Sequence, residues 1–432
     1  MIIKYPTTQL TPLAASVGLF LCPVVATAET TAPVSQKEMA QGLSIVSAKK
    51  VSPTRIDLTL SKERKMSVDF YSSEIFRLFR DDNGGEIRDP KAKPEAKILV
   101  DQPRQKVATL ELSEKEGKIV ILTELVRLEF DKASSLLKLI RLKDDKVLIN
   151  QLAAPTIGKK QVSLTFEESD DEYFYGGGVQ NGRFSHKGKS IAIENQNSWT
   201  DGGVASPNPY FWSTRGYGVM WHTFKKGRYD FDSSDQGKIT LSHDTDYLDL
   251  FIMAGETPAD LLGRYFQLTG KPLLLPKFGF YLGHLNAYNR DFWKEDEKGI
   301  LFEDGKRYKE SQKDNGGAKE TLNGEKGNYQ FSGRAAIDRY VNADMPLGWF
   351  LPNDGYGAGY GQTDSLDGNI ENLRQFGEYA RKHGVEIGLW TQSDLHPKDG
   401  IKPLLQRDIV KEVRDAGVRV LKTDVAWVGP GY

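Results

Sequence analysis

Hydrophobic and polar residues alternate with a period of two over much of the first half of the chain, from about Val51 to Met253. The segments RIDLTL (55–60), VRLEF (126–130) and QVSLTF (161–166) show this alternation. Glycine, aspartate, asparagine and lysine residues separate such segments, as expected for turns between half-buried strands. The pattern predicts an antiparallel β-sandwich over residues 51–256.

The pattern changes near Thr257. The segment TPADLLGRYFQLTG begins with a threonine suited to a helix N-cap, continues with a proline at the first helical position and ends at Gly270. Pro272 and Pro276 follow and mark a boundary. We therefore expect a helical junction over residues 257–276.

Beyond this junction, segments typical of strands and of helices alternate. The predicted strands are FGFYLGHL (278–285), LGWFL (347–351), VEIGLW (385–390) and VRVLKTDVAW (418–427), and the predicted helices between them are SGRAAIDRYVNADM (332–345), NIENLRQFGEYARKHG (369–384) and PLLQRDIVKEVRDAG (403–417). This alternation implies parallel strands covered by helices. A doubly wound sheet and a (β/α)8 TIM barrel both fit. A barrel needs eight strands, so residues 277–432 would form its first half, which indicates a truncated chain.

A long polar insert, residues 288–331, separates the first of these strands from its helix. It is dense in lysine, glutamate, aspartate, glycine and asparagine. In a barrel, an elaborated βα loop of this kind lies on the catalytic face. A solvent-exposed loop without a function fits the composition equally well.

The N-terminus has the features of a secretory signal peptide over residues 1–28. Lys4 supplies the positive charge, residues 13–25 form the apolar stretch, and Ala26-Thr27-Ala28 is an A-x-A cleavage site. The apolar stretch is shorter than the ~20 residues of a membrane span. We therefore expect export to the periplasm or the extracellular space without a membrane span, followed by a polar lead-in over residues 29–50.

Composition narrows the possible partners. The 58 lysine and arginine residues nearly balance the 59 aspartate and glutamate residues, for a net charge of −1, which argues against a nucleic-acid partner. Cys22, the single cysteine, falls within the signal peptide, so no intrachain disulfide is expected. The six histidines are scattered without metal-ligand spacing, and no metal or organic cofactor is expected. The sequence does not indicate an oligomeric state.

The strongest candidate chemistry lies in the last predicted strand, where Lys422 and Asp424 fall on one face near the C-terminal end. Interior strands of parallel sheets are normally aliphatic, and burying charges costs free energy. The presence of Lys422 and Asp424 in this strand therefore requires a structural or functional explanation. One interpretation is a structural ion pair. The other places Asp424 at a catalytic rim as a nucleophile, kept ionised by Lys422.

The other predicted strands also end in groups suited to a binding site. Asp354 follows the second strand, where barrel enzymes hold substrate, and His284 lies at the end of the first. Trp390 ends the third strand, where an aromatic ring either stacks on a sugar or packs in the core. Gly176-Gly177-Gly178 has no helix after it, which favours a crowded turn or bulge over a dinucleotide site.

These segments resemble glycoside hydrolase family 31, whose members are mostly retaining α-glycosidases and α-transglycosylases. The resemblance covers roughly residues 120–432. FYGGGVQ and NPYFWSTRGYGVMWHTF are similar to the N-terminal sandwich of that family, and TPADLLGRYFQLTGKPLLLPKFGFYLGH is similar to its junction into the barrel. LKTDVAW falls at the family's strand-four nucleophile, which implies that role for Asp424. The strand-two aspartate that binds sugar in the −1 subsite corresponds to Asp354.

The chain departs from the family in two respects. The commonest α-glucosidase pattern around the nucleophile is W-x-D-M-N-E, whereas this chain has Lys422-Thr423-Asp424-Val425-Ala426-Trp427. K-x-D is more like the related α-galactosidase families, so α-glucosides, α-galactosides and α-N-acetylgalactosaminides all remain open as substrates. The family's acid/base aspartate would lie beyond Tyr432.

The resemblance and the strand ends together predict an exported glycosidase that cleaves terminal α-glycosidic bonds with retention. Asp424 would be the nucleophile, Asp354 would bind sugar hydroxyls, Trp390 would wall the subsite and Lys422 would position Asp424. The alternatives are a non-catalytic carbohydrate-binding or vestigial fragment and an α-transglycosylase. The predicted partner in each case is a carbohydrate.

Overall fold

The structure is a computed structural model that describes residues 42–85, 87, 91–92, 96–286, 291–352, 370–392 and 409–424. The chain divides into two compact units, Met1–Lys271 and Pro272–Tyr432. The predicted signal peptide, residues 1–28, lies outside the described residues. Within the described part of the chain, no helix has both the length and the apolar character needed to cross a bilayer.

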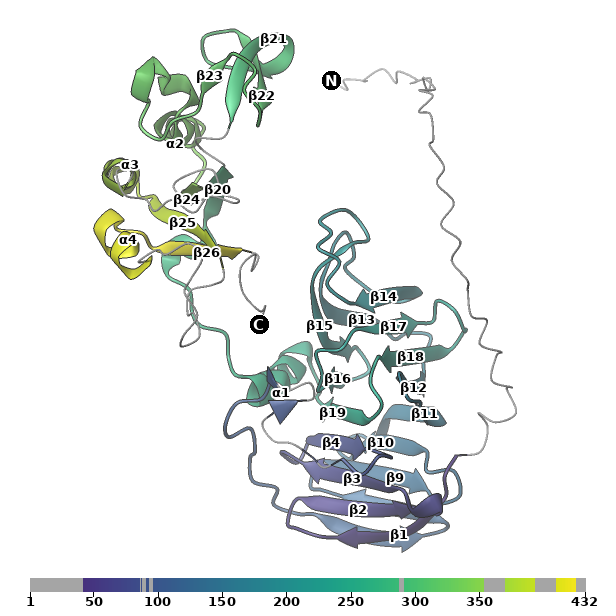
Figure 1. Ribbon diagram of the computed structural model, residues 1–432. Coiled ribbons are helices and arrows are strands. Elements are labelled where there is room, and N and C mark those ends of the chain that lie inside the picture. Colours follow the sequence, from purple (N-terminus) through teal and green to yellow (C-terminus); the bar gives the residue numbers. More distant parts are fainter. Residues whose placement is uncertain are drawn as a thin grey trace, which may run out of the picture. The chain divides into compact units, whose positions relative to one another are not determined.

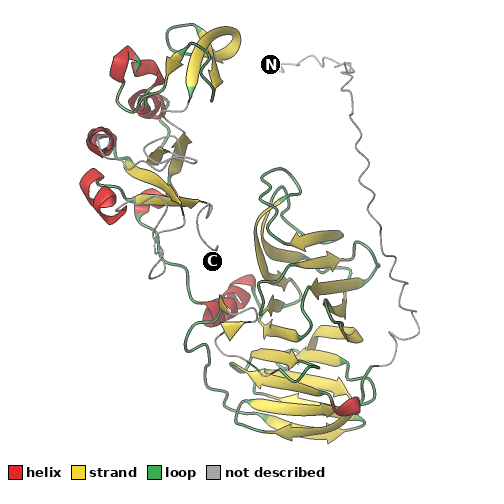
Figure 2. Ribbon diagram, in the orientation of Figure 1, coloured by secondary structure: helices red, strands yellow, loops and turns green. Residues whose placement is uncertain are grey.

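The first unit is built almost entirely of strands, arranged in two large antiparallel sheets (Figures 1 and 2). In spatial order, the eight-stranded sheet contains β1 (Ile45–Lys50), β2 (Arg55–Leu60), β3 (Lys65–Phe70), β4 (Ile75–Arg80), β19 (Leu248–Ala254), β16 (Tyr217–Trp221), β15 (Val204–Ser213) and β13 (Phe174–Gln180). The nine-stranded sheet contains β14 (Lys189–Ile193), β17 (Gly227–Phe231), β18 (Lys238–His243), β12 (Val162–Glu167), β11 (Lys146–Ile157), β10 (Leu137–Arg141), β9 (Val126–Asp131), β8 (Lys118–Leu122) and β7 (Glu111–Lys115). A short hairpin, β5 (Lys91–Ala92) with β6 (Ala96–Lys97), and the 3-10 turn η1 (Ser61–Glu63) complete the strand-rich part.

The core of the first unit lies between the two sheets. Ile56 and Leu58 of β2, from one sheet, belong to the same buried cluster as Leu164 and Phe166 of β12, from the other. In β2 the burial pattern alternates with the period of two seen in the sequence. The predicted β-sandwich is confirmed.

Two boundaries differ from the sequence prediction. Residues 45–50, expected to belong to a polar lead-in, form the edge strand β1, because Ile45 inserts into the sandwich core. The helix α1 (Pro258–Thr269) belongs to the first compact unit, because Leu261 and Leu268 pack in a buried cluster under the eight-stranded sheet.

The glycine cluster forms a bulge in β13, as the sequence indicates. The pairing of β13 with β15 shifts register between Gly176 and Gly178, and both residues have positive φ angles, 115° and 80°. A Cβ atom at Gly178 would lie 2.1 Å from the carbonyl oxygen of Ser206. The aromatic segment 208–212 lies in β15, and its Phe211 packs in the sandwich core.

The second unit contains a four-stranded parallel sheet. Its order is β20 (Leu282–Asn286), β24 (Leu347–Pro352), β25 (Glu386–Gln392) and β26 (Val420–Asp424), the order of the sequence. The helices α2 (Gly333–Asn342), α3 (Ile370–Lys382) and α4 (Ile409–Ala416) alternate with these strands. Sequential parallel pairing is the arrangement of a (β/α)8 barrel wall, whereas a doubly wound sheet reverses its strand order at a switch point.

The first predicted strand of this unit is shorter than expected. Residues 277–280 form the 3-10 turn η2 (Lys277–Phe280), and β20 begins only at Leu282. Local turn bonds replace sheet pairing here, since the Gly279 amide donates to the Pro276 carbonyl and the Tyr281 amide donates to the Phe278 carbonyl.

The insert folds into a small antiparallel sheet of its own, in the order β22 (Arg307–Ser311), β21 (Phe292–Leu301), β23 (Ala318–Lys319). Two 3-10 turns, η3 (Glu325–Gly327) and η4 (Tyr329–Phe331), lead from it into α2. The insert is therefore an ordered structure within the second unit, in contrast to the irregular loop that its composition predicts.

Candidate functional site

The two faces of the parallel sheet have different surroundings. Ile387 and Leu389 of β25 point into the core shared with the helices, so the alternate residue Trp390 lies on the opposite face. In the register between β25 and β26, Trp390 pairs with Lys422 and Gln392 pairs with Asp424. Positions 422 and 424 therefore fall on the face turned away from the helices, at the C-terminal end of β26.

This face carries the sequence-predicted residues Lys422, Asp424 and Trp390 on two neighbouring strands. Trp390 is only 1% exposed, which makes it a packed wall of the site rather than a free ring, and Lys422 is half-buried. On the same face, Leu351 lies against Gly388, where a Cβ atom would approach within 2.8 Å of Leu351. The small residue lets neighbouring strands carry bulky side chains on this side of the sheet.

His284 does not join these residues. Its ring stacks on Phe350, with centroids 4.5 Å apart, and its Nδ1 lies 3.1 Å from the hydroxyl of Tyr340 in α2. Burial lowers the pKa of His284 to about 4, so the ring is neutral near pH 7. His284 lies on the helix-packed side of the sheet, since its pairing partner Phe350 belongs to the core under α3. The sequence analysis places His284 among the polar groups at the strand ends, whereas the structure puts its ring on the face of the sheet opposite positions 422 and 424. Asp354 lies outside the described residues.

A cavity in the insert escaped the sequence analysis. It has a volume of about 280 Å³, and it lies between the insert sheet, η4 and α2. Among its lining residues are Trp293, Phe302, Glu303, Glu320, Phe331 and Arg339. The sequence signal that could have revealed it is the set of aromatic residues spaced through an otherwise polar segment.

The insert also contains the one group of carboxylates in the described residues with metal-ligand spacing. Oxygen atoms of Asp291, Glu310 and Glu320 lie within 4.8 Å of one another. Asp291 and Glu320 are buried, and Glu310 is exposed. Glu320 already accepts a hydrogen bond from Trp293 Nε1 at 2.7 Å, which ties this group to the aromatic cluster of the insert.

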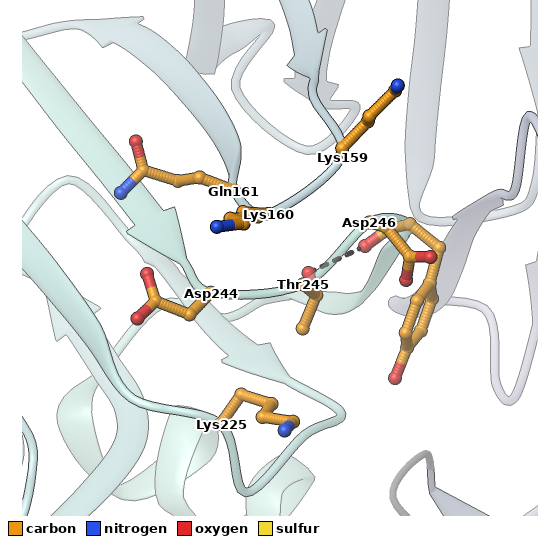
Figure 3. Close-up of a pocket in the computed structure, with 8 residues that line it drawn as sticks. Lys159, Lys160, Gln161, Lys225, Asp244, Thr245 and Asp246 are labelled. Carbon is orange, nitrogen blue, oxygen red and sulfur yellow. Dashed lines mark hydrogen bonds between the residues drawn. The ribbon is translucent and has the colours of Figure 1, made fainter. Parts of the chain in front are cut away.

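A broad, open hollow of about 830 Å³ lies on the sandwich (Figure 3). Lys159, Lys160 and Lys225 line it together with Asp244 and Asp246. Charges of both signs are interspersed there, so the hollow favours neither an anionic nor a cationic ligand.

Part of the chain is similar to known proteins. The family model described as the glycosyl hydrolase 31 N-terminal galactose mutarotase-like domain matches residues 65–230, which run from β3 to β17. An α-xylosidase of Emericella nidulans is 29% identical over 131 residues, covering 30% of this chain and 17% of the relative. The α-xylosidase XylQ of Lactiplantibacillus pentosus is 25% identical over 215 residues, covering 50% of this chain and 27% of the relative.

The fold agrees with solved structures. A family 31 dextranase of Flavobacterium johnsoniae, complexed with isomaltotriose, superposes with a TM-score of 0.62 at 15% identity. The match covers 82% of this chain and 39% of the dextranase. Residues 65–230 are therefore similar to the N-terminal domain of glycoside hydrolase family 31, and the chain spans less than a third of the length of the two α-xylosidases.

Proposed function

We propose that the complete protein is an exported, retaining glycosidase that cleaves terminal α-glycosidic bonds, with Asp424 as its nucleophile. The observation that carries the proposal is the pairing of β25 with β26. It brings Lys422 and Asp424 beside Trp390 and Gln392, at the C-terminal end of the parallel strands and on the face away from the helices. Catalytic residues of (β/α)8 barrels lie at that end of the strands.

The proposed reaction is a double displacement. The Asp424 carboxylate attacks the anomeric carbon, the bond to the leaving oxygen breaks, and a glycosyl ester forms on the enzyme. A second carboxylic acid protonates the leaving oxygen and then takes a proton from the water that cleaves the ester. Retention of configuration requires the two carboxyl groups to lie about 5–5.5 Å apart.

Lys422 supports the nucleophile in this scheme. Lys422 lies two residues away on the same strand face, and its ammonium group is proposed to position the carboxylate. Trp390 gives the site a rigid wall, and Asp354 is proposed to accept hydrogen bonds from sugar hydroxyls.

The substrates proposed are oligosaccharides or polysaccharides with a terminal α-linked sugar. Two relatives are named α-xylosidases, and another, 28% identical over 156 residues, is named α-glucosidase 2 of Bacillus thermoamyloliquefaciens. Xylose therefore joins glucose, galactose and N-acetylgalactosamine as a candidate sugar. A panel of 4-nitrophenyl α-glycosides of these four sugars assigns the specificity.

The test compares Asp424→Asn with Asp415→Asn in the full-length protein. Asp415 is an exposed residue of α4, so its variant makes the same chemical change in the helical layer. We expect Asp424→Asn to lower kcat by at least about a thousandfold, since a lost nucleophile removes the covalent route. Activity of Asp424→Asn within a few fold of the Asp415→Asn control would rule out the proposed nucleophile.

A further inference from the structure

The insert cavity is built from aromatic residues that hold one another in place. The rings of Trp293 and Phe331 lie nearly parallel, 9° apart in orientation, with centroids separated by 5.8 Å. Phe302 meets both of them edge-on, at 5.1 Å in each case. Edge-to-face and offset-stacked rings at these distances attract one another, so the apolar wall has a fixed shape.

Polar groups line the rest of the cavity. Glu320 is buried and accepts the hydrogen bond from Trp293 Nε1, and Glu303 accepts from Arg339. The Arg339 guanidinium also lies over the Phe302 ring, 4.9 Å from its centroid. Carboxyl groups outnumber the guanidinium in the lining, so the cavity is poorly suited to an anion. Carboxylates beside aromatic faces suit a neutral ligand that has both hydroxyl groups and apolar C–H faces.

The insert is fixed to the helical layer at two places. Tyr329 of η4 and Tyr379 of α3 both donate hydrogen bonds to Asp338 of α2. Arg339 of α2 bonds Glu303 in the insert and the backbone carbonyl of Gln330. These contacts preorganise the cavity, so a ligand would bind without the entropic cost of ordering the insert.

The cavity lies on the helix-packed side of the parallel sheet. His284 of β20, whose ring lies on that side, lines the cavity together with Ala336 and Arg339 of α2. Positions 422 and 424 of β26 fall on the opposite face. A ligand in the cavity would therefore lie apart from the proposed catalytic site.

We propose that the insert cavity is a binding site for one sugar unit of a neutral oligosaccharide or polysaccharide, separate from the site proposed at Asp424. Its volume of about 280 Å³ is near the lower end of the roughly 300–1,000 Å³ typical of ligand pockets, which suits one ring rather than a whole oligosaccharide. This proposal rests on the proposed function, because it assigns the cavity to a carbohydrate ligand.

The test measures binding separately from catalysis. The full-length Asp424→Asn protein is titrated calorimetrically with maltotriose, with isomaltotriose, with an α-xylosylated xyloglucan heptasaccharide and with the acidic α-linked trimer of galacturonate. Trp293→Ala removes the aromatic wall. The double change Ile300→Ala/Leu301→Ala trims two lining residues that are 62% and 59% exposed, and it therefore leaves the buried packing of the insert intact. Val341→Ala removes an apolar side chain of α2 that is 48% exposed and lies outside the cavity lining.

We expect at least one neutral oligosaccharide to bind. Both cavity variants should weaken that binding about fivefold or more, roughly 1 kcal/mol, whereas Val341→Ala should not change it.

Three results would overturn the proposal: no binding of any neutral probe at millimolar concentrations, equal affinity in the double variant and in Val341→Ala, or equally tight binding of the acidic trimer. The calorimetric titration measures binding without any cleavage of the oligosaccharide. A protein that binds oligosaccharides in the cavity but cleaves none would contradict the proposed function while supporting the binding site.

Discussion

Replacing Asp249 with asparagine should destabilise the first unit severely, because Asp249 neutralises a fully buried arginine. Arg77 of β4 is 0% exposed, and its Nε and Nη2 donate to the two carboxylate oxygens of Asp249 at 2.7 Å each. Tyr71 accepts a further bond from Nη1 at 3.2 Å, and His222 Nδ1 lies 3.0 Å from Nη2. The pair joins β4 to its neighbour β19 in the middle of the eight-stranded sheet.

The expected loss of stability follows from the Arg77 charge that Asp249→Asn leaves buried without a partner of opposite charge. Burial alone would lower the pKa of Arg77, but the charge and hydrogen bonds of Asp249 raise it above its ordinary value, so the guanidinium stays charged. Removing one partner of a buried ion pair costs about 3–5 kcal/mol, because the other charge is left without compensation. Asp249→Asn should therefore lower the free energy of unfolding of the first unit by about that amount.

The assay is urea-induced unfolding of the 432-residue chain at pH 7, followed by tryptophan fluorescence, since Trp221 is buried in the same sheet. Asp235→Asn, at the exposed pair between Asp235 and Lys238, makes the same chemical change and should cost no more than about 1 kcal/mol. The double variant Arg77→Met/Asp249→Leu removes both charges and should recover most of the lost stability. The reasoning is refuted if Asp249→Asn is no more destabilising than Asp235→Asn.

Three further outcomes are expected in the first unit. Gly178→Ala should destabilise the first unit by roughly 1–3 kcal/mol or more, because the positive φ angle and the Ser206 carbonyl both oppose a Cβ atom. The control is Gly237→Ala, because Gly237 has a positive φ angle but open space around it. The difference between the two variants in thermal unfolding measures the cost of the clash with Ser206. Thr257→Ala should cost about 1 kcal/mol in denaturant unfolding, since Thr257 and Asp260 form a capping box on α1, and Thr257→Ser should restore most of it. Burial lowers the pKa of His243 to about 4, so the folded chain holds this ring in its neutral form. The neutral ring contributes fully to the free energy of unfolding above the ordinary histidine pKa of 6.5. As the pH falls toward 4, this contribution is lost, and the free energy of unfolding decreases by roughly 3 kcal/mol. Unfolding free energies at pH 7.5 and 4.5 should therefore differ less in His243→Asn than in the unsubstituted chain, and an unchanged difference would contradict this assignment.

The sandwich was predictable because several strands, such as β2 and β12, have a burial pattern that follows the alternation in their own sequences. In β12, buried Val162, Leu164 and Phe166 alternate with partly exposed neighbours, so a window of six residues suffices to identify the strand. The order of strands in the two sheets was not predictable, because pairings such as β4 with β19 join segments about 170 residues apart in the chain.

The structure of the insert was not predictable from its amino-acid composition. Its many charged residues indicate a solvated loop, yet Trp293, Phe302 and Phe331 form a small core within it. These residues are too widely spaced for any periodic pattern to reveal them. Their contacts arise from the tertiary structure, which brings β21 against η4.

The candidate site was predictable in part. Lys422 and Asp424 stand out because a charged pair breaks the aliphatic pattern of a parallel strand, and the structure brings them into register with Trp390 and Gln392. The face of the sheet that His284 occupies was not predictable, because its position at a strand end does not determine the face. Its stacking on Phe350, on the helix side, is a property of the register between β20 and β24.

Trapping the covalent intermediate tests the central claim most directly. The full-length protein is incubated with 5-fluoro-α-glycosyl fluorides of glucose, galactose and xylose and with the matching N-acetylgalactosamine reagent, digested, and examined by tandem mass spectrometry. The account predicts that the reagent matching the preferred sugar adds one glycosyl group, by an ester bond, to Asp424. A glycosyl ester on any other residue would contradict the account, as would full activity on the matching substrate with no label at Asp424.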